Sequence, residues 1–163
     1  MKLKYCIYSV FILLATCAFV TRTNEKSNQL RLDPQYAQIL KVDFELNSIR
    51  DLICGRALRD VSLIPGRGEM SSLAVVPYIQ AERELGRGWP SKAISMAGCS
   101  RLDNIRDLIT AIVHNHIEGD FIETGTWRGG ASIFARRVFD AFGQHSRRVY
   151  VADSFKGLPR ATY

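Results

Sequence analysis

Two carboxylates and a glycine-rich loop are the residues of this 163-residue chain that could bind a ligand together. Glu123 follows two apolar residues in the stretch DFIETGTWRGG, and Asp153 ends the apolar run VYVAD. In an open α/β sheet, ligands bind at the carboxyl ends of the strands, where a loop leads into a helix N-terminus. Gly125 and the Gly129–Gly130 pair would let backbone amides approach a bound molecule without a β-carbon in the way. The pattern predicts a ligand site in which Asp153 would hold a ribose diol.

The spacing of the glycines argues against a dinucleotide as that ligand. The G-x-G-x-x-G pattern is absent, and the loop instead reads E-x-G-x-x-x-G-G. A pyrophosphate favours a bare positive helix end, which Glu123 would oppose with its negative charge. The same carboxylate suits a cationic ligand such as S-adenosylmethionine, which carries an ammonium and a sulfonium. An NAD-dependent oxidoreductase is therefore disfavoured, and a loop that needs its glycines only for packing is the structural alternative.

Hydrophobic periodicity predicts the elements that position these residues. Apolar residues at three- and four-residue steps predict a helix that starts at Ser100, with Asp103 reaching back to the helix start as in a capping box, and that ends near Gly119. The elements predicted after it are a strand over 121–123, a helix over 131–143 and a strand over 149–153. This order is typical of an α/β fold with a parallel sheet.

The region before this unit gives a weaker pattern. Apolar spacing over 34–53 predicts a helix, 63–72 reads as a loop, and 72–90 reads as a short helical segment. Cys54 and Cys99 lie outside the apolar N-terminal run and form no CxxC pair, so the sequence supports neither a zinc site nor a redox motif. A disulfide and two free thiols both fit this spacing, and free thiols are the commoner outcome.

The N-terminus has the pattern of a secretory signal. MKLK precedes an uncharged apolar run over 5–20, after which the chain turns polar. We therefore expect a signal peptide or signal anchor at 1–21, a polar linker at 22–33 and the folded domain at 34–163. The apolar run is just shorter than a usual membrane span, so secretion and membrane anchoring by residues 5–20 both stay open.

The formal net charge of +6 at pH 7 does not predict a nucleic-acid-binding protein. The basic residues are scattered beside acidic ones, as in RDLICGRALRD, and no basic run is interleaved with aromatic residues. We expect a solvated surface and no nucleic-acid partner.

Three stretches resemble the macrocin O-methyltransferase (TylF-like) family, whose members are S-adenosylmethionine-dependent enzymes. They are GRGWPSKAISMAGCSRLDNIRDLI, EGDFIETGTWRGGASIFARRVF and RRVYVADSFKGLP, and they follow one another in the family's order and spacing. The resemblance implies a Rossmann-like class I methyltransferase fold of the α/β class, preceded by N-terminal helices. Because the chain stops soon after the second strand, it would hold only the N-terminal, cofactor-binding part.

The resemblance also implies three groups of cofactor-binding residues. The group that would cover the cofactor from the N-terminal side is Ser95, Met96 and Ala97. The group at the first strand end and in the loop after it is Glu123, Thr124, Gly125, Trp127, Arg128 and Gly129. The group beyond the second strand is Asp153, which would hold the ribose diol, with Ser154 and Phe155 close to the adenine.

The activity implied by the resemblance is magnesium-assisted methyl transfer from S-adenosylmethionine to a hydroxyl of a sugar or a similar small molecule. No catalytic residue or metal ligand is assigned, since the family's Asp-rich metal site has no counterpart in this sequence. We expect a fragment that is inactive alone and that enters the secretory pathway. The alternative is a non-catalytic secretory or membrane-anchored protein that keeps the cofactor half for binding or assembly, and a homo-oligomer stays open.

Overall fold

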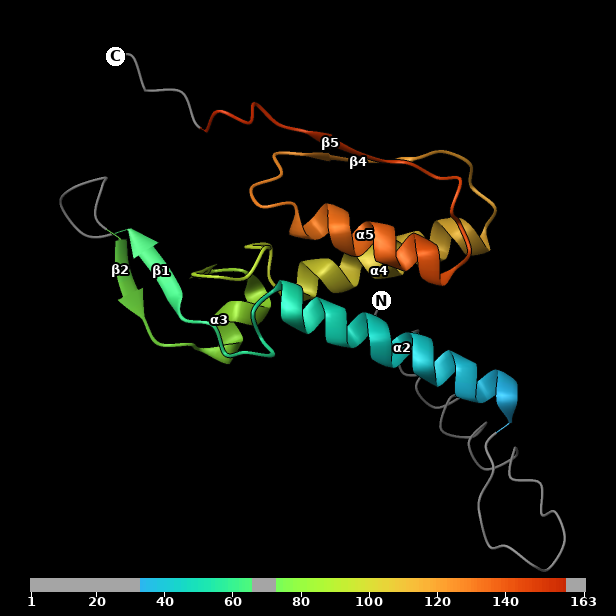
Figure 1. Cartoon of the computed structure of the whole chain (residues 1–163), viewed down its shortest axis with the longest axis horizontal. Coiled ribbons are helices and arrows are strands. Elements are labelled where there is room, and N and C mark those ends of the chain that lie inside the picture. The colour runs from blue at the N-terminus through green and yellow to red at the C-terminus, as the bar shows by residue number, and fades with distance from the viewer. Residues whose placement is uncertain (1–32, 66–72, 158–163) are drawn as a thin grey trace, which may run out of the picture. The chain divides into compact units, whose positions relative to one another are not determined.

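The computed structural model of the chain describes residues 33–65 and 73–157 (Figure 1). The predicted signal segment at 1–21 and all but the last residue of the predicted linker at 22–33 lie outside the described residues. The chain divides into two compact units, Met1–Phe44 and Glu45–Tyr163. Within the described ranges, no helix is both long and apolar enough to cross a membrane.

Helix α2 runs from Pro34 to Ile53, as the apolar spacing predicted, and the division between the two units falls inside it. Its start is capped by Asp33, whose Oδ1 accepts hydrogen bonds from the amides of Gln35 at 2.8 Å and Tyr36 at 3.2 Å. Such a cap satisfies amides that have no partner inside the helix. The residues buried by the second half of α2 are Leu46, Arg50 and Ile53.

A small antiparallel sheet and a short helix occupy the stretch that the sequence predicted as a loop and one helical segment. Strand β1 (Ser62–Pro65) pairs with β2 (Leu73–Val76) on one side and with β3 (Trp89–Pro90) on the other. Only α3 (Gln80–Leu85) is helical there. The prediction was wrong because strands of four residues or fewer are too short for their alternation to be told from other spacings.

The rest of the second unit is the predicted series of helix, strand, loop, helix and strand. Its elements are α4 (Cys99–His114), β4 (Phe121–Thr124), α5 (Gly130–Ala141) and β5 (Val149–Ala152). Strands β4 and β5 are parallel, as predicted, with Phe121 opposite Val149. Helix α5 packs against both strands and also against α4, so it lies between the strand pair and α4 (Figure 1).

The apolar core of this layer arrangement is centred on α5. Its buried face recurs at helical spacing, and each large apolar side chain buried there contributes about 1.5–3 kcal/mol. The fully buried residues of this face are Phe134, Ala135, Val138 and Phe139, and those of α4 include Leu102 and Ile109. Ile133, which precedes Phe134 on the same helix, is 47% exposed.

The start of α4 differs from the predicted capping box. Gly98 is the N-cap residue, and no side chain there bonds to the helix amides. The carboxylate of Asp103 instead accepts a hydrogen bond from Nη1 of Arg50 at 2.6 Å and lies 3.3 Å from Nη2 of Arg106. A charge-assisted bond to a guanidinium is stronger than a bond to a neutral amide. The capping-box prediction was therefore wrong, because local sequence does not reveal that Arg50 of α2 lies beside Asp103.

Cys54 and Cys99 form a disulfide that joins the residue after α2 to the first residue of α4. Their Cα atoms are 5.8 Å apart and both residues are buried. Of the two outcomes left open by the sequence, the structure has the disulfide, and the expected free thiols were wrong. The closed loop, residues 54–99, contains the whole antiparallel sheet and is called the 54–99 loop below.

Candidate functional site

Asp153 lies directly beyond β5, and its carboxylate is oriented by neighbouring backbone amides. Oδ2 accepts a hydrogen bond from the amide of Thr126 at 2.7 Å, and Oδ1 accepts one from the amide of Phe155 at 3.1 Å. These bonds, that from Thr126 first, hold the pKa of Asp153 below its ordinary value. The side chain is exposed, so a charged carboxylate of fixed orientation is accessible to a ligand hydroxyl.

Glu123, on β4, caps helix α5. Its Oε2 accepts hydrogen bonds from the amide of Ser132 at 3.0 Å and from the Ser132 hydroxyl. The carboxylate thereby accepts a hydrogen bond from one of the amides that have no partner inside the helix, and its negative charge offsets the partial positive charge of the helix N-terminus. A pyrophosphate would need that helix end, so this geometry also disfavours a dinucleotide.

Between the two carboxylates, the backbone at Gly125 is bare. Its amide donates to the carbonyl of Ala152 at 2.9 Å. Apart from its two chain neighbours, no described residue has an atom within 4 Å of the position that a β-carbon would take. The next side chain, Thr126, is buried, and its Oγ1 has no hydrogen-bond partner in the described part of the chain. An unpaired buried hydroxyl costs about 1–3 kcal/mol. A polar ligand group could supply the missing partner.

Trp127 and Arg128 follow in the loop, and Arg128 bonds to the chain itself. Its guanidinium lies over the Trp127 ring, 4.2 Å from the centroid. Its Nη1 donates to the carbonyls of Ser91 at 3.1 Å and Ala93 at 3.0 Å. Gly129 then serves as the N-cap of α5. The predicted contact of Arg128 with a cofactor stays a prediction, and its donors already hold the segment that precedes Ser95.

The segment Ser95–Ala97, predicted to cover the cofactor, is tied to the same loop through the residue before it. The amide of Gly130 donates to the carbonyl of Ile94 at 3.0 Å. A β-carbon at position 130 would lie 2.4 Å from that oxygen, so this approach requires glycine. On its other side, the amide of the buried Ser95 donates to the carbonyl of Ile53 at 3.0 Å. The covering segment and the glycine-rich loop are therefore neighbours.

The predicted residues beyond β5 are placed less tightly than Asp153. The Ser154 hydroxyl donates to the carbonyl of Gly157 at 3.0 Å within its own turn, and Phe155 is 74% exposed. Thr124 ends β4 opposite Ala152 and is exposed. The structure thus brings Glu123 to Gly125 together with Asp153 and Ser154 at the carboxyl ends of β4 and β5, beside the exposed ring of Phe155.

Sequence analysis missed two residues of this site. Thr126 orients Asp153 with its amide, and Ser132 holds the Glu123 carboxylate. Neither belongs to a periodic pattern, and the only signal for Thr126 was its position directly after Gly125, between the two predicted strand ends.

The described ranges contain one group of three potential metal ligands: Asp51, Cys54 and Cys99. Both cysteines are in the disulfide, and the Asp51 carboxylate pairs with Arg50 at 2.9 Å and Arg56 at 2.8 Å. Mg²⁺ binds through oxygen ligands in near-octahedral geometry. This group does not fit Mg²⁺, and no metal ligand is assigned.

Comparison with known proteins identifies the family. The profile of the macrocin O-methyltransferase (TylF) family matches residues 56–163. The chain belongs to this family. That match covers the glycine-rich loop, both site carboxylates and the covering segment.

Individual relatives match the chain over shorter stretches. The chain is 52% identical over 77 residues to the 8-demethyl-8-(2,3-dimethoxy-α-L-rhamnosyl)-tetracenomycin-C 4′-O-methyltransferase of Streptomyces olivaceus, covering 47% of this chain and 30% of that protein. It is 45% identical over 82 residues to the demethyldecarbamoylnovobiocin O-methyltransferase of Streptomyces niveus, covering 50% and 31%. It is 41% identical over 85 residues to the mycinamicin III 3″-O-methyltransferase of Micromonospora griseorubida, covering 52% and 34%.

The fold is similar to that of a solved methyltransferase. The O-methyltransferase NovP superposes with a TM-score of 0.61 at 36% identity, over 72% of this chain and 44% of NovP. The α/β arrangement is thus methyltransferase-like. The matched region spans less than half of NovP and no more than 34% of any of the three curated relatives.

Proposed function

We propose that this chain binds S-adenosylmethionine at the carboxyl ends of β4 and β5 and supplies the cofactor-binding part of an O-methyltransferase. The observation that carries the proposal is the carboxylate of Asp153, held by the Thr126 amide at 2.7 Å beside the bare backbone of Gly125. Membership of the macrocin O-methyltransferase family supports the same cofactor.

Each residue of the site has a role in this proposal. Asp153 accepts hydrogen bonds from the ribose hydroxyls, and its lowered pKa keeps it charged. The buried Thr126 hydroxyl, which lacks a partner in the described part, bonds to a polar atom of the cofactor. Gly125 leaves room for the methionine part, and Glu123 adds a negative charge near its ammonium. When bound, the cofactor supplies an electrophilic methyl group.

The acceptor that we propose is a hydroxyl of a sugar or a similar small molecule. All three relatives are named O-methyltransferases, and one of the names contains a rhamnosyl group. The family resemblance also implies Mg²⁺, for which the described residues offer no fitting ligands. Methyl transfer by this chain is tested by incubating it with labelled S-adenosylmethionine and a rhamnosylated acceptor. Cofactor binding without any transfer would favour the non-catalytic alternative.

We also propose that the chain folds in an oxidising compartment, such as that of the secretory pathway. The buried disulfide supports this proposal, because disulfides are rare in reducing compartments. The signal-like sequence at 1–21 points the same way. Alkylation of native cell extracts, followed by mass spectrometry, should find Cys54 and Cys99 unmodified before reduction. Alkylated cysteines would contradict the proposal.

Calorimetric titration of S-adenosylhomocysteine into the purified chain tests cofactor binding. The matched variants are Asp153→Asn and Asp107→Asn, the latter an exposed helix carboxylate whose side chain is 67% exposed. We expect binding by the unmutated chain, at least tenfold weaker binding by Asp153→Asn, and no change with Asp107→Asn. Absence of binding by the unmutated chain would refute the proposed function.

A further inference from the structure

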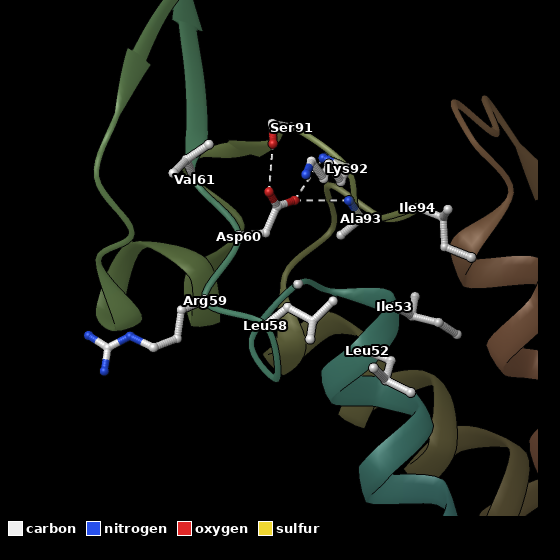
Figure 2. Close-up of a pocket in the computed structure, with 11 residues that line it drawn as sticks. Leu52, Ile53, Leu58, Arg59, Asp60, Val61, Ser91, Lys92, Ala93 and Ile94 are labelled. Atoms are coloured by element: carbon white, nitrogen blue, oxygen red, sulfur yellow. Dashed lines mark hydrogen bonds between the residues drawn. The ribbon is translucent and has the colours of Figure 1, made fainter.

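Asp60 fixes the amide side of the segment Ser91–Ala93. Its Oδ2 accepts hydrogen bonds from the amides of Lys92 at 2.8 Å and Ala93 at 2.9 Å, and its Oδ1 accepts one from the Ser91 hydroxyl at 2.6 Å (Figure 2). Asp60 lies more than thirty positions earlier in the sequence. One carboxylate thus holds three consecutive residues.

Arg128 fixes the carbonyl side of the same segment. Its Nη1 donates to the carbonyls of Ser91 and Ala93, at 3.1 Å and 3.0 Å. The carboxylate of Asp60 and the guanidinium of Arg128 therefore bind opposite polar groups of one short stretch of backbone. Bonds with a charged partner are stronger than those between neutral groups. Arg128 belongs to the glycine-rich loop, so the stretch connects that loop to the start of β1.

The backbone of Asp60 is itself held by a buried cation, Arg83. Arg83 is 1% exposed, and its Nη2 donates to the carbonyl of Asp60 at 2.9 Å and to the hydroxyl of Ser62 at 2.8 Å. Its Nη1 donates to the carbonyl of Cys54 at 3.0 Å. The backbone that carries Asp60 is therefore anchored to α3, and the carboxylate has a fixed position.

A pocket of about 520 Å³ is lined in part by Asp60, but the carboxylate already bonds to other residues of the protein. The pocket lies between the end of α2, the turn before β1 and the segment 91–94, and Figure 2 shows Asp60 pointing at Ser91, Lys92 and Ala93. Both oxygens of Asp60 already accept hydrogen bonds. The geometry of the Asp60 carboxylate therefore favours a role in positioning the segment Ser91–Ala93 over a role in binding a ligand in the pocket.

We infer that Asp60 and Arg128 are positioning residues, which clamp Ser91–Ala93 from its two sides and thereby set Ser95–Ala97 against the bound cofactor. The inference rests on the function proposed above. Only Ile94 separates the clamped residues from Ser95, and Ile94 is itself bonded to Gly130 of the loop. Releasing either side of the clamp frees the same segment, so the two residues act together.

Titration of S-adenosylhomocysteine into the whole chain tests the clamp through a double-mutant cycle. We expect Asp60→Asn and Arg128→Gln each to weaken binding about tenfold, and the double variant to bind little worse than either. The matched controls are Asp107→Asn and Arg87→Gln, since the Arg87 side chain is 64% exposed and pairs only with Glu82 among the described residues. Unchanged affinity in the single variants, or a roughly hundredfold loss in the double variant, would overturn the inference.

The fluorescence of Trp127 gives a second readout that does not depend on cofactor binding. Arg128 stacks on this indole, and the chain has two tryptophans, so a Trp89→Phe background leaves Trp127 as the only one. In that background, we expect Asp60→Asn to shift the emission spectrum toward that of Arg128→Gln. An emission spectrum unchanged by Asp60→Asn refutes the link between the two residues. If the spectral shift is seen but the unmutated chain binds no S-adenosylhomocysteine, the proposed function is refuted, while the joint positioning of Ser91–Ala93 by Asp60 and Arg128 is supported.

Discussion

The β4–β5 region, residues 121–152, and the 54–99 loop are stabilised in different ways. In the β4–β5 region, a parallel ladder and the apolar face of α5 provide the regular contacts. In the 54–99 loop, the strands are short, and charged side chains bond to backbone far away in the sequence. The glycine-rich loop, which lies on a regular scaffold, therefore bonds to a neighbouring region that is held mainly by polar side-chain contacts and one disulfide.

Removing apolar volume from α5 should cause the largest loss of stability. Phe134 is fully buried, and we expect Phe134→Ala to lower the free energy of unfolding by about 3–5 kcal/mol. Ile133→Ala, on the neighbouring exposed position, should lower it by less than about 1 kcal/mol. Urea denaturation of both variants checks this difference. Equal losses would show that the β4–β5 region does not depend on its apolar face.

Opening the disulfide should be the next largest effect, and it should act on the 54–99 loop. Cys54 and Cys99 are 45 positions apart, and a disulfide that closes a loop of this order stabilises by about 2–4 kcal/mol. We expect the Cys54→Ala, Cys99→Ala double variant to lose that amount in urea denaturation. Reductant should destabilise the unmutated chain to the same extent and leave the double variant unaffected.

Replacing the buried cation of the 54–99 loop should cost slightly less. Arg83→Met keeps the apolar stem but removes the donors to Cys54, Asp60 and Ser62. We expect a loss of about 2–3 kcal/mol, because buried acceptors are left unpaired. Arg83→Lys should recover only part of it, since one ammonium cannot reproduce the planar fork of a guanidinium. Full recovery by lysine in thermal or urea denaturation would count against this account.

The smallest expected effect is a pH dependence that comes from Asp60. Burial acts to raise its pKa, but the hydrogen bonds from Ser91, Ala93 and Lys92, with the charge of Arg83, outweigh burial and lower the pKa. A lowered pKa in the folded state gives stability that is fully present above the unfolded pKa and is lost as pH falls through the folded pKa. The stability difference between the unmutated chain and Asp60→Asn should therefore shrink below about pH 4. Urea denaturation at several pH values measures it, and a constant difference would contradict the assignment.

Most of the β4–β5 region could be predicted from the sequence. The helix predicted at 131–143 is α5 at Gly130–Ala141, and the two predicted strands form the expected parallel pair. Local periodicity was sufficient there because the apolar residues that make the core also define the elements. The strand-end positions of Glu123 and Asp153 followed from the same pattern. Their roles toward a cofactor stay predictions.

The 54–99 loop could not be predicted in the same way. Strands of four residues carry too little alternation, and an arginine such as Arg83 is normally read as a solvent-exposed residue. The partners of Asp60 lie more than thirty residues away, and a single sequence does not say which distant residues meet. The same limitation explains the wrong capping box, since the partner of Asp103 is Arg50 on α2.

The close approach of Gly130 to Ile94 has a consequence for protein engineering by recombination. The two backbones meet where no β-carbon fits, so the loop and the covering segment must be matched in shape. A chimaera with another family member that takes residues 91–97 from one parent and 127–132 from the other would combine two backbones that were never selected together. Crossover points are better placed before residue 91 or after residue 132, so that both segments, with α4 between them, come from one parent.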